Sequence, residues 1–369
     1  MTEAVLLVGG QGTRLRPLTV NTPKPMLPVA GVPFTVHQIT RARDAGVTRI
    51  VLATSYRADV FHDFIGENDL GIEVVIATEE SPLGTGGAIR YAADHLSTGV
   101  LAKLRSSPDD PVLVFNGDVL SGLDIAGLVA RHQETDSDVT LYLTRVEDPR
   151  AYGLVPTDAD GRVLEFREKP TTEAEIVTDQ INAGCYVFRR SVIDSIPAGE
   201  KVSVERQTFP SLLASGARVS AVVDEGYWLD LGTPLSFVQG SCDLVLGRAP
   251  SPAVPQTGES LVLGGARVAD SAVLRAGTTV GRNAIVGVDV VVDGAVLFDG
   301  ARIEAGARIT NSIVGEGAWI GEDVVLDGAV IGDNAVIGAG NELLDGVRVW
   351  PGAQLAPGTV RFSSDQASS

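Results

Sequence analysis

The feature that most constrains the fold is a six-residue repeat of aliphatic side chains in the last third of the chain. From Val268 onward these side chains recur six residues apart, and at intervals one step shortens to five. As a result, the segments DGAVLFDGARIEAG, TNSIVGEGAWIGED and DGAVIGDNAVIGAG follow one another every 17 residues. That length is close to three six-residue sides, so the pattern predicts triangular coils of short strands stacked into a parallel β-helix. The repeating positions are Val268, Leu274, Val280, Val286, Val292, Leu297, Ile303, Ile309, Val314, Ile320, Leu326, Ile331, Ile337, Leu343, Val349 and Leu355.

The residues between the aliphatic positions support the same prediction. Gly, Asn and Asp recur there, and these residues adopt the positive φ of a sharp corner at little cost. A β-sandwich with frequent turns is the alternative, but sandwich strands alternate with period two rather than six. The repeat resembles the left-handed β-helix of hexapeptide-repeat proteins, and the resemblance covers residues 261–358.

The first 247 residues follow a different pattern, in which short apolar runs alternate with amphipathic stretches. This alternation predicts an α/β fold with a Rossmann-like, mostly parallel sheet covered by helices. We expect strands at Ala4–Val8, Arg49–Thr54, Glu73–Thr78, Pro111–Phe115, Asp138–Val146, Gly161–Phe166 and Asn182–Arg189. We expect helices at Pro33–Ala45, Ala58–Glu67, Gly86–Leu96 and Asp124–Glu134, and a last one that begins at Thr233-Pro234.

The two patterns divide the chain into domains. At 369 residues the chain exceeds the size at which a single core usually stops growing. Residues 248–260, RAPSPAVPQTGES, lack apolar periodicity and read as a linker. We therefore predict a catalytic α/β domain at 1–247, the linker at 248–260, the β-helix at 261–358 and a tail at 359–369.

Charge and composition exclude several classes of function. The net charge of −18 disfavours nucleic acid and anionic membranes as partners, because both would be repelled. No apolar stretch approaches the ~18 residues that span a bilayer, and no basic leader precedes the first strand. Only Cys185 and Cys242 are present, outside any CxxC spacing, which favours a reducing, cytoplasmic location.

A glycine loop with built-in positive charge follows the first predicted strand. The strand AVLLV runs into GGQGTRLR, and the segment PKPMLP comes shortly after it. Glycines let backbone N–H groups approach phosphate oxygens, and Arg14 and Lys24 can neutralise a triphosphate. A Walker A loop is disfavoured because the lysine and hydroxyl are missing at its spacing, and a dinucleotide fold is disfavoured because the second strand ends Thr54-Ser55-Tyr56 without an acid.

These two segments closely resemble the nucleotide-sugar pyrophosphorylases, whose signature is a GxGTRLxPLT loop followed by PKPMLP, and the catalytic half matches across its whole length. Overall the chain is most similar to bacterial GDP-mannose pyrophosphorylases with a C-terminal β-helix. The resemblance implies that Arg14, Lys24, Asp118, Lys169 and Asp230 are catalytic. It implies that the nucleotide contacts Leu7, Gly9, Gly10, Gly12, Thr13, Arg14, Glu79, Gly84, Thr85 and Asp118.

The segment EESPLGTGG after the third strand holds the nucleobase in this family. Uridylyl- and thymidylyl-transferring relatives tend to place Gln five residues before the glycine, where this chain has Glu79. One carboxylate can accept the N1–H and N2–H₂ donors of guanine together, whereas a pyrimidine offers one N–H between acceptors. We therefore expect GTP as the donor. A solvated loop acid is the alternative for Glu79.

Two aspartates match the family's metal-binding positions. Asp118 follows the strand PVLVF, at the carboxyl end where ligands of open α/β sheets bind, and Asp230 lies in WLDLG. Mg²⁺ commonly takes one or two carboxylates plus phosphate oxygens, so the pair suffices for a Mg²⁺ site. By the same resemblance the sugar phosphate contacts Gly153, Glu168, Lys169, Asn182 and Glu205.

The expected reaction is attack by a sugar 1-phosphate on the α-phosphorus of the triphosphate, with release of pyrophosphate and with mannose 1-phosphate favoured. Glucose 1-phosphate with UTP or dTTP, and heptose 1-phosphate with GTP, stay open as alternatives. A silent regulatory subunit like those of translation exchange factors is a third, although such subunits tend to lose the charged residues retained here. An acetyltransferase activity is disfavoured because the β-helix has no histidine. We expect the β-helix to support homo-oligomerisation.

Overall fold

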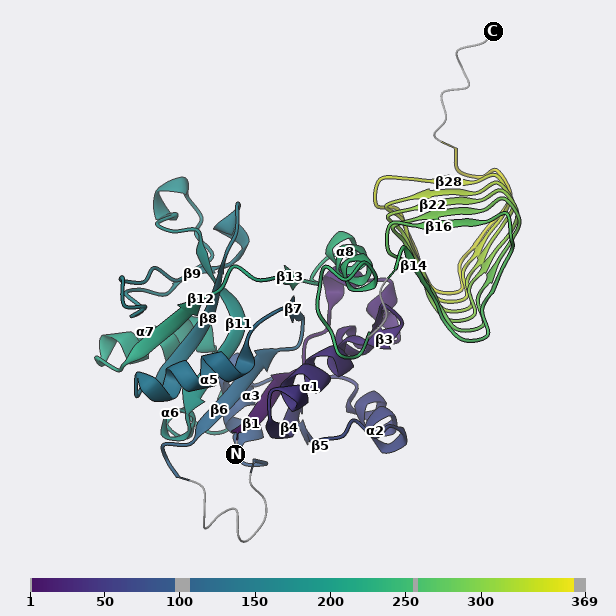
Figure 1. The fold of residues 1–369 in the computed structure, drawn as a ribbon. Coiled ribbons are helices and arrows are strands. Elements are labelled where there is room, and N and C mark those ends of the chain that lie inside the picture. The colour runs from purple at the N-terminus through teal and green to yellow at the C-terminus, as the bar shows by residue number, and fades with distance from the viewer. Residues whose placement is uncertain (1, 97–106, 255–257, 362–369) are drawn as a thin grey trace. The chain divides into compact units, whose positions relative to one another are not determined.

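The computed structural model describes residues 2–96, 107–254 and 258–361, which form two compact units (Figure 1). Neither unit is one continuous stretch. The first consists of Met1–Gly10 with Gln38–Trp228, and the second of Gln11–His37 with Leu229–Ser369. The glycine loop from Gln11 onward and the PKPMLP segment thus belong to the same unit as the β-helix, whereas Gly9 and Gly10 belong to the first unit.

The first unit is built on a nine-stranded sheet with the order β10-β9-β11-β6-β1-β4-β5, in which β8 pairs with β11 and β12. The four strands β6, β1, β4 and β5 are parallel, and β11 runs antiparallel to β6. The mostly parallel sheet predicted from the sequence is therefore confirmed. The strands are β1 (Thr2–Leu7), β4 (Val47–Thr54), β5 (Glu73–Thr78), β6 (Pro111–Asn116), β8 (Val139–Arg145), β9 (Gly153–Leu154), β10 (Arg167–Glu168), β11 (Gln180–Arg189) and β12 (Val219–Val223), with the short β7 (Val119–Ser121) and β13 (Trp228–Asp230) outside this sheet.

Helices cover the sheet because its strands alternate apolar side chains between two faces. One face packs Val5, Val51 and Val114 against Ile89 and Ala92 of α3. The helix α5 packs against β6, β8 and β12, and Asp124 caps it by accepting from Gly127 N at 3.0 Å, as predicted. The helices are α1 (Phe34–Asp44), α2 (Ala58–Glu67), α3 (Gly84–Ala93), α5 (Ile125–Glu134), α6 (Arg190–Asp194), α7 (Phe209–Ala214) and α8 (Pro234–Val245), the last with Thr233 as its N-cap.

The strand predicted at Gly161–Phe166 is wrong. This stretch forms only isolated bridges, one between Thr157 and Val163 and one between Arg162 and Ser220. The chain turns sharply before it, because Asp158 Oδ1 accepts from Arg162 N at 2.8 Å and Gly161 has a φ of +82°. The segment GRVLEF runs beside the edge strand β12 for only a few residues, where Val163 N donates to Val219 O and Ala221 N donates to Gly161 O. This contact is too short to form a strand.

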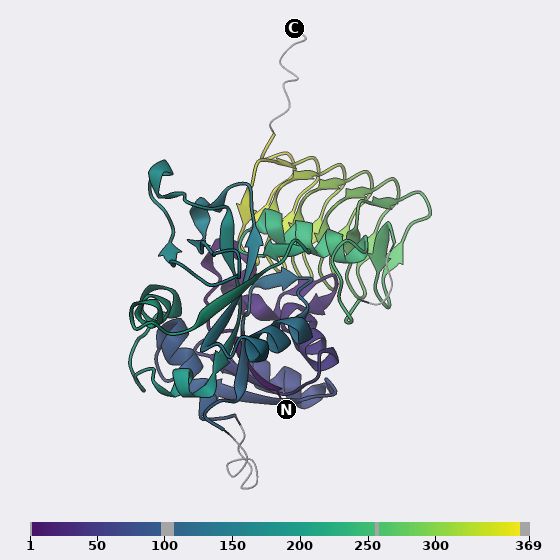
Figure 2. The same cartoon turned by 60° about the vertical axis from the view of Figure 1, so that its left-hand side comes forward.

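The second unit contains the predicted left-handed β-helix, whose coils appear stacked in Figure 2. All the repeating aliphatic positions lie in its core or pack against it, and Gly, Asn and Asp take positive φ at the corners, as expected. Side 1 consists of β14 (Ser260–Val262), β17 (Thr278–Val280), β20 (Val296–Leu297), β23 (Ile313–Val314), β26 (Val330–Ile331) and β29 (Arg348–Val349). Side 2 consists of β15 (Arg267–Val268), β18 (Ile285–Val286), β21 (Arg302–Ile303), β24 (Trp319–Ile320), β27 (Val336–Ile337) and β30 (Gln354–Leu355), and side 3 of β16 (Val273–Arg275), β19 (Val291–Asp293), β22 (Arg308–Thr310), β25 (Val325–Asp327) and β28 (Glu342–Leu343).

The outward face of side 1 is apolar and buried. Leu297, Val314 and Ile331 point into the coil, so their strand neighbours Val296, Ile313 and Val330 point outward. These three are nevertheless at most 1% exposed. The helix α8 packs on β17, and the Phe237 ring meets the Phe298 ring edge-on at 6.3 Å between centroids.

The predicted boundaries at 247, 260 and 358 stay predictions, and residues 255–257 and 362–369 lie outside the described part of the chain. Among the described residues, the helices are all too short or too polar to cross a bilayer.

Candidate active site

The carboxyl ends of four parallel strands meet at one edge of the first unit's sheet. Leu7 at the end of β1 is in register with Ala53 of β4 and Asn116 of β6. Gly117 N donates to Leu7 O at 2.9 Å, and a Cβ on Gly117 would lie 2.3 Å from that oxygen. Only glycine permits this approach, which places Asp118 beside the end of the first strand, at the edge predicted from the sequence.

Two side chains of α1 hold the loop that carries Asp118. Gln38 Nε2 donates to Asn116 O at 2.8 Å and to Val119 O at 3.2 Å, on either side of Asp118. One turn later, Arg41 Nη2 donates to Leu123 O at 2.6 Å. Neither Gln38 nor Arg41 was predicted from the sequence, although their spacing of three on a predicted helix puts them on one face.

Glu79 is buried, with only 6% of its surface exposed, so the alternative of a solvated loop acid is wrong. Its Oε2 accepts from Leu83 N at 2.8 Å and thereby closes the turn that leads into α3. Burial raises the pKa of the Glu79 carboxyl, and the bond from Leu83 opposes this shift.

The start of α3 is bound to a segment far along the chain. Gly86 N and Gly87 N both donate to Val202 O, at 2.8 and 3.3 Å. These two N–H groups are therefore committed to the protein rather than to a phosphate. Thr85 Oγ1 donates to Glu205 Oε2 at 2.8 Å, so a predicted nucleotide residue and a predicted sugar residue contact each other directly.

The other predicted sugar-phosphate residues gather near Glu205. Gly153 is in register with Glu168, and a Cβ on Gly153 would lie 3.0 Å from Glu168 Oε2. Exposed Lys169 places its Nζ 3.7 Å from Glu168 Oε1. The pKa of Glu168 is raised, chiefly by burial, with the Lys169 charge lowering it and the Glu205 charge raising it.

Asn182 joins this group through a tyrosine. At a bulge in β11, Asn182 Oδ1 accepts from Gly184 N at 3.1 Å and its Nδ2 donates to Tyr186 Oη at 2.7 Å. The phenol of Tyr186 is fully buried, and burial together with the charge of Glu205 raises its pKa. Tyr186 carries no sequence motif, so it was not predicted.

In the second unit, the loop cations Arg14 and Lys24 lie close to a segment far along the chain that carries Asp230. Gly12 has a φ of +59°, and a Cβ there would lie 2.8 Å from Lys24 Cβ. The buried Lys24 places its Nζ 3.9 Å from Asp230 Oδ1. Arg14 lies against Gly232, where a Cβ would come within 2.7 Å of Arg14 Nη2. The GTRL, PKP and WLDLG segments therefore lie next to one another.

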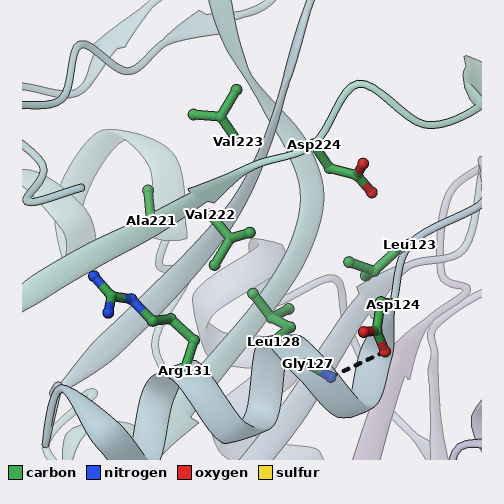
Figure 3. A pocket seen from close by; sticks show the side chains of 9 residues that line it. All are labelled: Leu123, Asp124, Gly127, Leu128, Arg131, Ala221, Val222, Val223 and Asp224. Atoms are coloured by element: carbon green, nitrogen blue, oxygen red, sulfur yellow. Dashed lines mark hydrogen bonds between the residues drawn. The ribbon is translucent and has the colours of Figure 1, made fainter. Parts of the chain in front are cut away.

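A groove of about 470 Å³ between α5 and β12 includes none of the predicted site residues (Figure 3). Its charged groups already have partners within the fold. Asp124 caps α5, Asp224 accepts from Tyr142 Oη at 3.2 Å, and Arg131 donates to Asp160 O at 2.9 Å. The lining residues are Leu123, Asp124, Gly127, Leu128, Arg131, Ala221, Val222, Val223 and Asp224.

Comparison with known proteins gives the class. Residues 3–245 match the family model of the nucleotidyl transferases, and residues 256–356 match the model described as GMPPB C-terminal domain. The chain therefore belongs to the nucleotidyl transferase family.

Two curated relatives and one solved structure show which activities are found among proteins similar to this chain. The chain is 54% identical over 366 residues to a mannose-1-phosphate guanylyltransferase of Mycobacterium tuberculosis, covering 98% of each chain. It is 38% identical to the catalytic subunit beta of the same activity from Drosophila pseudoobscura, over 65% of this chain and 62% of that one. Among solved structures, HddC from Yersinia pseudotuberculosis complexed with GMP-PN is 30% identical with a TM-score of 0.54, covering 65% of this chain and 98% of that chain.

Proposed function

We propose that this nucleotidyltransferase is a mannose-1-phosphate guanylyltransferase, which transfers GMP from GTP to mannose 1-phosphate and releases pyrophosphate. The observation that carries the proposal is the meeting of Arg14, Lys24 and Asp230 in a chain of net charge −18. Such an acidic molecule needs a local cationic site to bind a triphosphate. The substrates follow those named for the mycobacterial relative.

Glu79 is the residue that selects guanine. Each carboxylate oxygen can accept two hydrogen bonds, so the bond from Leu83 N leaves capacity for the N1–H and N2–H₂ donors of guanine. The same bond fixes the orientation of the carboxylate before the base arrives. Pre-orientation of this kind lowers the entropy lost on binding.

Nucleotidyl transferases generally work with a divalent metal ion, and we propose Mg²⁺ held by Asp118 and Asp230. The donor set fits, because both are half-buried carboxylates and Mg²⁺ takes one or two carboxylates together with phosphate oxygens. When bound, the ion neutralises charge on the phosphates. Lys24, 3.9 Å from Asp230, is placed to act on the same phosphates.

The chain's own groups then position two phosphorylated reactants. Lys169 holds the mannose 1-phosphate, and Arg14 and Lys24 hold the triphosphate. A phosphate oxygen of the sugar forms a bond to the α-phosphorus, and the bond from that phosphorus to the bridging oxygen breaks, so pyrophosphate leaves with the electron pair. No general base is required, since a phosphate monoester with a second pKa near ~6 is already largely dianionic at pH 7.

The sugar-binding groups are Gly153, Glu168, Lys169, Asn182 and Glu205. The charge of Glu205 lies close enough to Glu168 to raise its pKa, and both carboxylates are placed to accept from sugar hydroxyls. Heptose 1-phosphate with GTP is the second candidate, and the likeness to the HddC structure complexed with GMP-PN supports its guanine nucleotide.

The proposal is tested by a matrix of GTP, ATP, UTP and dTTP against mannose, glucose and heptose 1-phosphates, with pyrophosphate release as the readout. We expect the highest kcat/KM for GTP with mannose 1-phosphate. We expect the Asp118→Asn variant to keep its fold and to lose about 100-fold or more in rate. The proposal fails if another pair is preferred by tenfold, or if wild type releases no pyrophosphate with any pair.

We propose a cytoplasmic location, supported by two free buried thiols, Cys185 and Cys242. We also propose homo-oligomers that assemble through the β-helix, which exposes Val273, Val288 and Trp350 at 45%, 53% and 53%. Light scattering on wild type and a Trp350→Gln variant tests the second proposal, and a monomeric wild type would end it.

A further inference from the structure

The segment that carries Arg14 and Lys24 has little regular structure of its own. Between residues 11 and 33 its elements are η1 (Thr13–Leu15), η2 (Leu18–Val20), η3 (Lys24–Met26), β2 (Pro28–Val29) and β3 (Val32–Pro33), each of two or three residues. Stretches with so few internal hydrogen bonds are held by what they pack against. The conformation of the cationic loop therefore depends on its partners in the second unit.

The part of the segment between the two cations is bound by the last coils of the β-helix. Arg348, the first residue of β29, donates from Nη1 to Arg16 O at 2.7 Å. Asn21 forms a side-chain hydrogen bond with Asp333, at the corner one coil earlier. Both bonds fall between Arg14 and Lys24 in sequence, so they fix the stretch that separates the cations.

The far end of the segment is bound by α8 and the first coils. Ala30 N donates to Ser241 Oγ at 2.9 Å, and Ser241 Oγ lies 3.3 Å from Thr279 Oγ1 on β17. Leu263 packs so tightly on Gly31 that a Cβ there would lie 2.3 Å from Leu263 Cδ1. The segment is thus anchored to side 1 near both β14 and β29, which a spacing of ~4.8 Å per strand puts about 24 Å apart.

The chemistry of side 1 fits this role. Its outward residues in the middle coils, Val296, Ile313 and Val330, are buried and apolar, and the series ends in the charged donor Arg348. By contrast, the outward residues of sides 2 and 3 are exposed, as Arg302 and Arg308 are, or only partly buried, and Arg348 at the end of side 1 is itself exposed. Side 1 is therefore the side whose outward residues are covered in the middle coils.

We infer that side 1 of the β-helix is the template that sets the shape of the cationic loop, and that Arg348 and Asn21 are positioning residues for Arg14 and Lys24. The expected effect on GTP binding and turnover rests on the proposed function. The expected effect on the order of the cationic loop does not. The β-helix then has a role in every catalytic cycle of each subunit, independent of any role in assembly.

The test uses full-length variants. Arg348→Met keeps the aliphatic stem but cannot donate, and Asn21→Ala leaves the β-helix unchanged. Arg308→Met on side 3 is the matched control, and Arg348→Lys is the conservative rescue. We expect faster amide exchange in peptides covering residues 11–26 for the first two variants only, and a KM for GTP raised about 5- to 10-fold at nearly constant KM for mannose 1-phosphate. Arg348→Lys should restore most of the affinity.

The inference is overturned if Arg348→Met and Asn21→Ala match Arg308→Met in both exchange and KM, or if the exchange increase spreads over the β-helix rather than the loop. Melting temperatures separate loop effects from global unfolding, and Asn21→Ala serves as the second variant if Arg348→Met folds poorly. Should wild type prove inactive with all nucleotides, the proposed function fails, and amide exchange still decides the structural inference.

Discussion

At the scale of single residues, the glycines matter as much as the charged residues that they allow to approach. Gly12 lets Lys24 lie flat against the loop, and Gly232 does the same for Arg14. In both cases an added Cβ would come within 2.8 Å of the cationic side chain. The glycines in GxGTRL and WLDLG thus place charge, besides any approach of their own N–H groups to phosphate.

Gly12→Ala should therefore displace Lys24, and the positive φ at residue 12 adds strain. We expect kcat/KM for GTP to fall about 100-fold, the usual loss for a misplaced catalytic donor. Steady-state kinetics measure this, with Gly66→Ala as the control because a Cβ there meets nothing within 4 Å. A Gly12→Ala enzyme within threefold of wild type would contradict this reading.

Glu79→Gln should erode the preference for GTP. An amide offers one acceptor where the carboxylate offers two, so guanine keeps one bond and faces an N–H₂ donor. We expect kcat/KM for GTP to fall about 10- to 100-fold while UTP gains in relative terms. The neighbouring exposed Glu80→Gln is the control, and equal kinetics for both variants would remove Glu79 from base selection.

The motifs made the residue-scale predictions possible, because glycines, cations and aspartates in fixed spacing carry chemical meaning without any structure. Gln38, Tyr186 and Arg348 were missed for the opposite reason. Gln38 and Arg348 donate to backbone carbonyls distant in sequence, and Tyr186 contacts Asn182 across the bulge in β11. Nothing local in the sequence distinguishes such residues from ordinary polar residues.

Gln38→Met should weaken both the fold and the proposed metal site. The carbonyls of Asn116 and Val119 would lose their donor, at a cost of about 1–3 kcal/mol, and the Asp118 loop would loosen. We expect a higher Mg²⁺ concentration for half-maximal rate, measured by metal titration of activity alongside urea unfolding. An unchanged metal requirement in a destabilised enzyme would leave Gln38 with a purely structural role.

At the scale of elements, the β-helix was the most predictable part of the molecule. Its repeat places each inward residue by local spacing alone, and every predicted aliphatic position is in or against the core. Gly161–Phe166 was mistaken for a strand because its alternation resembles one, whereas the turn at Asp158 decides its path. The outward apolar series at Val296, Ile313 and Val330 is also present in the sequence, but the inward repeat alone does not predict that this face is covered.

Ile320→Ala should cost about 2–5 kcal/mol, since Ile320 is fully buried in the coil and its removal leaves a cavity. Val288→Ala, at a residue 53% exposed, should cost less than about 0.5 kcal/mol. Urea unfolding gives both values. Equal losses would mean that the aliphatic stack is not what holds the coils together.

At the scale of the whole molecule, stability depends on two buried histidines. Burial lowers the pKa of His37 and of His132 to about 4, and Arg189 adds to the shift of His132. Between pH 6.5 and 4 the unfolded chain therefore binds more protons than the folded one, so stability falls as the pH drops through this range.

We expect each histidine to remove about 2–3 kcal/mol between pH 7 and pH 4.5. His132→Gln can retain a hydrogen bond to Thr140 and should reduce the pH slope of the unfolding free energy by that share. Urea titrations at several pH values measure the slope. Identical slopes for wild type and variant would show that His132 does not titrate as described.

We propose that the basic loop residues Arg14 and Lys24 and the two aspartates Asp118 and Asp230 act on one triphosphate. The direct measurement is a crystal structure with mannose 1-phosphate, a non-hydrolysable GTP analogue and Mn²⁺ in place of Mg²⁺. We expect an anomalous peak bound by Asp118 and Asp230, with Arg14 and Lys24 contacting the triphosphate and Lys169 contacting the sugar phosphate. Manganese bound elsewhere, or these five residues divided between separate ligands, would contradict it.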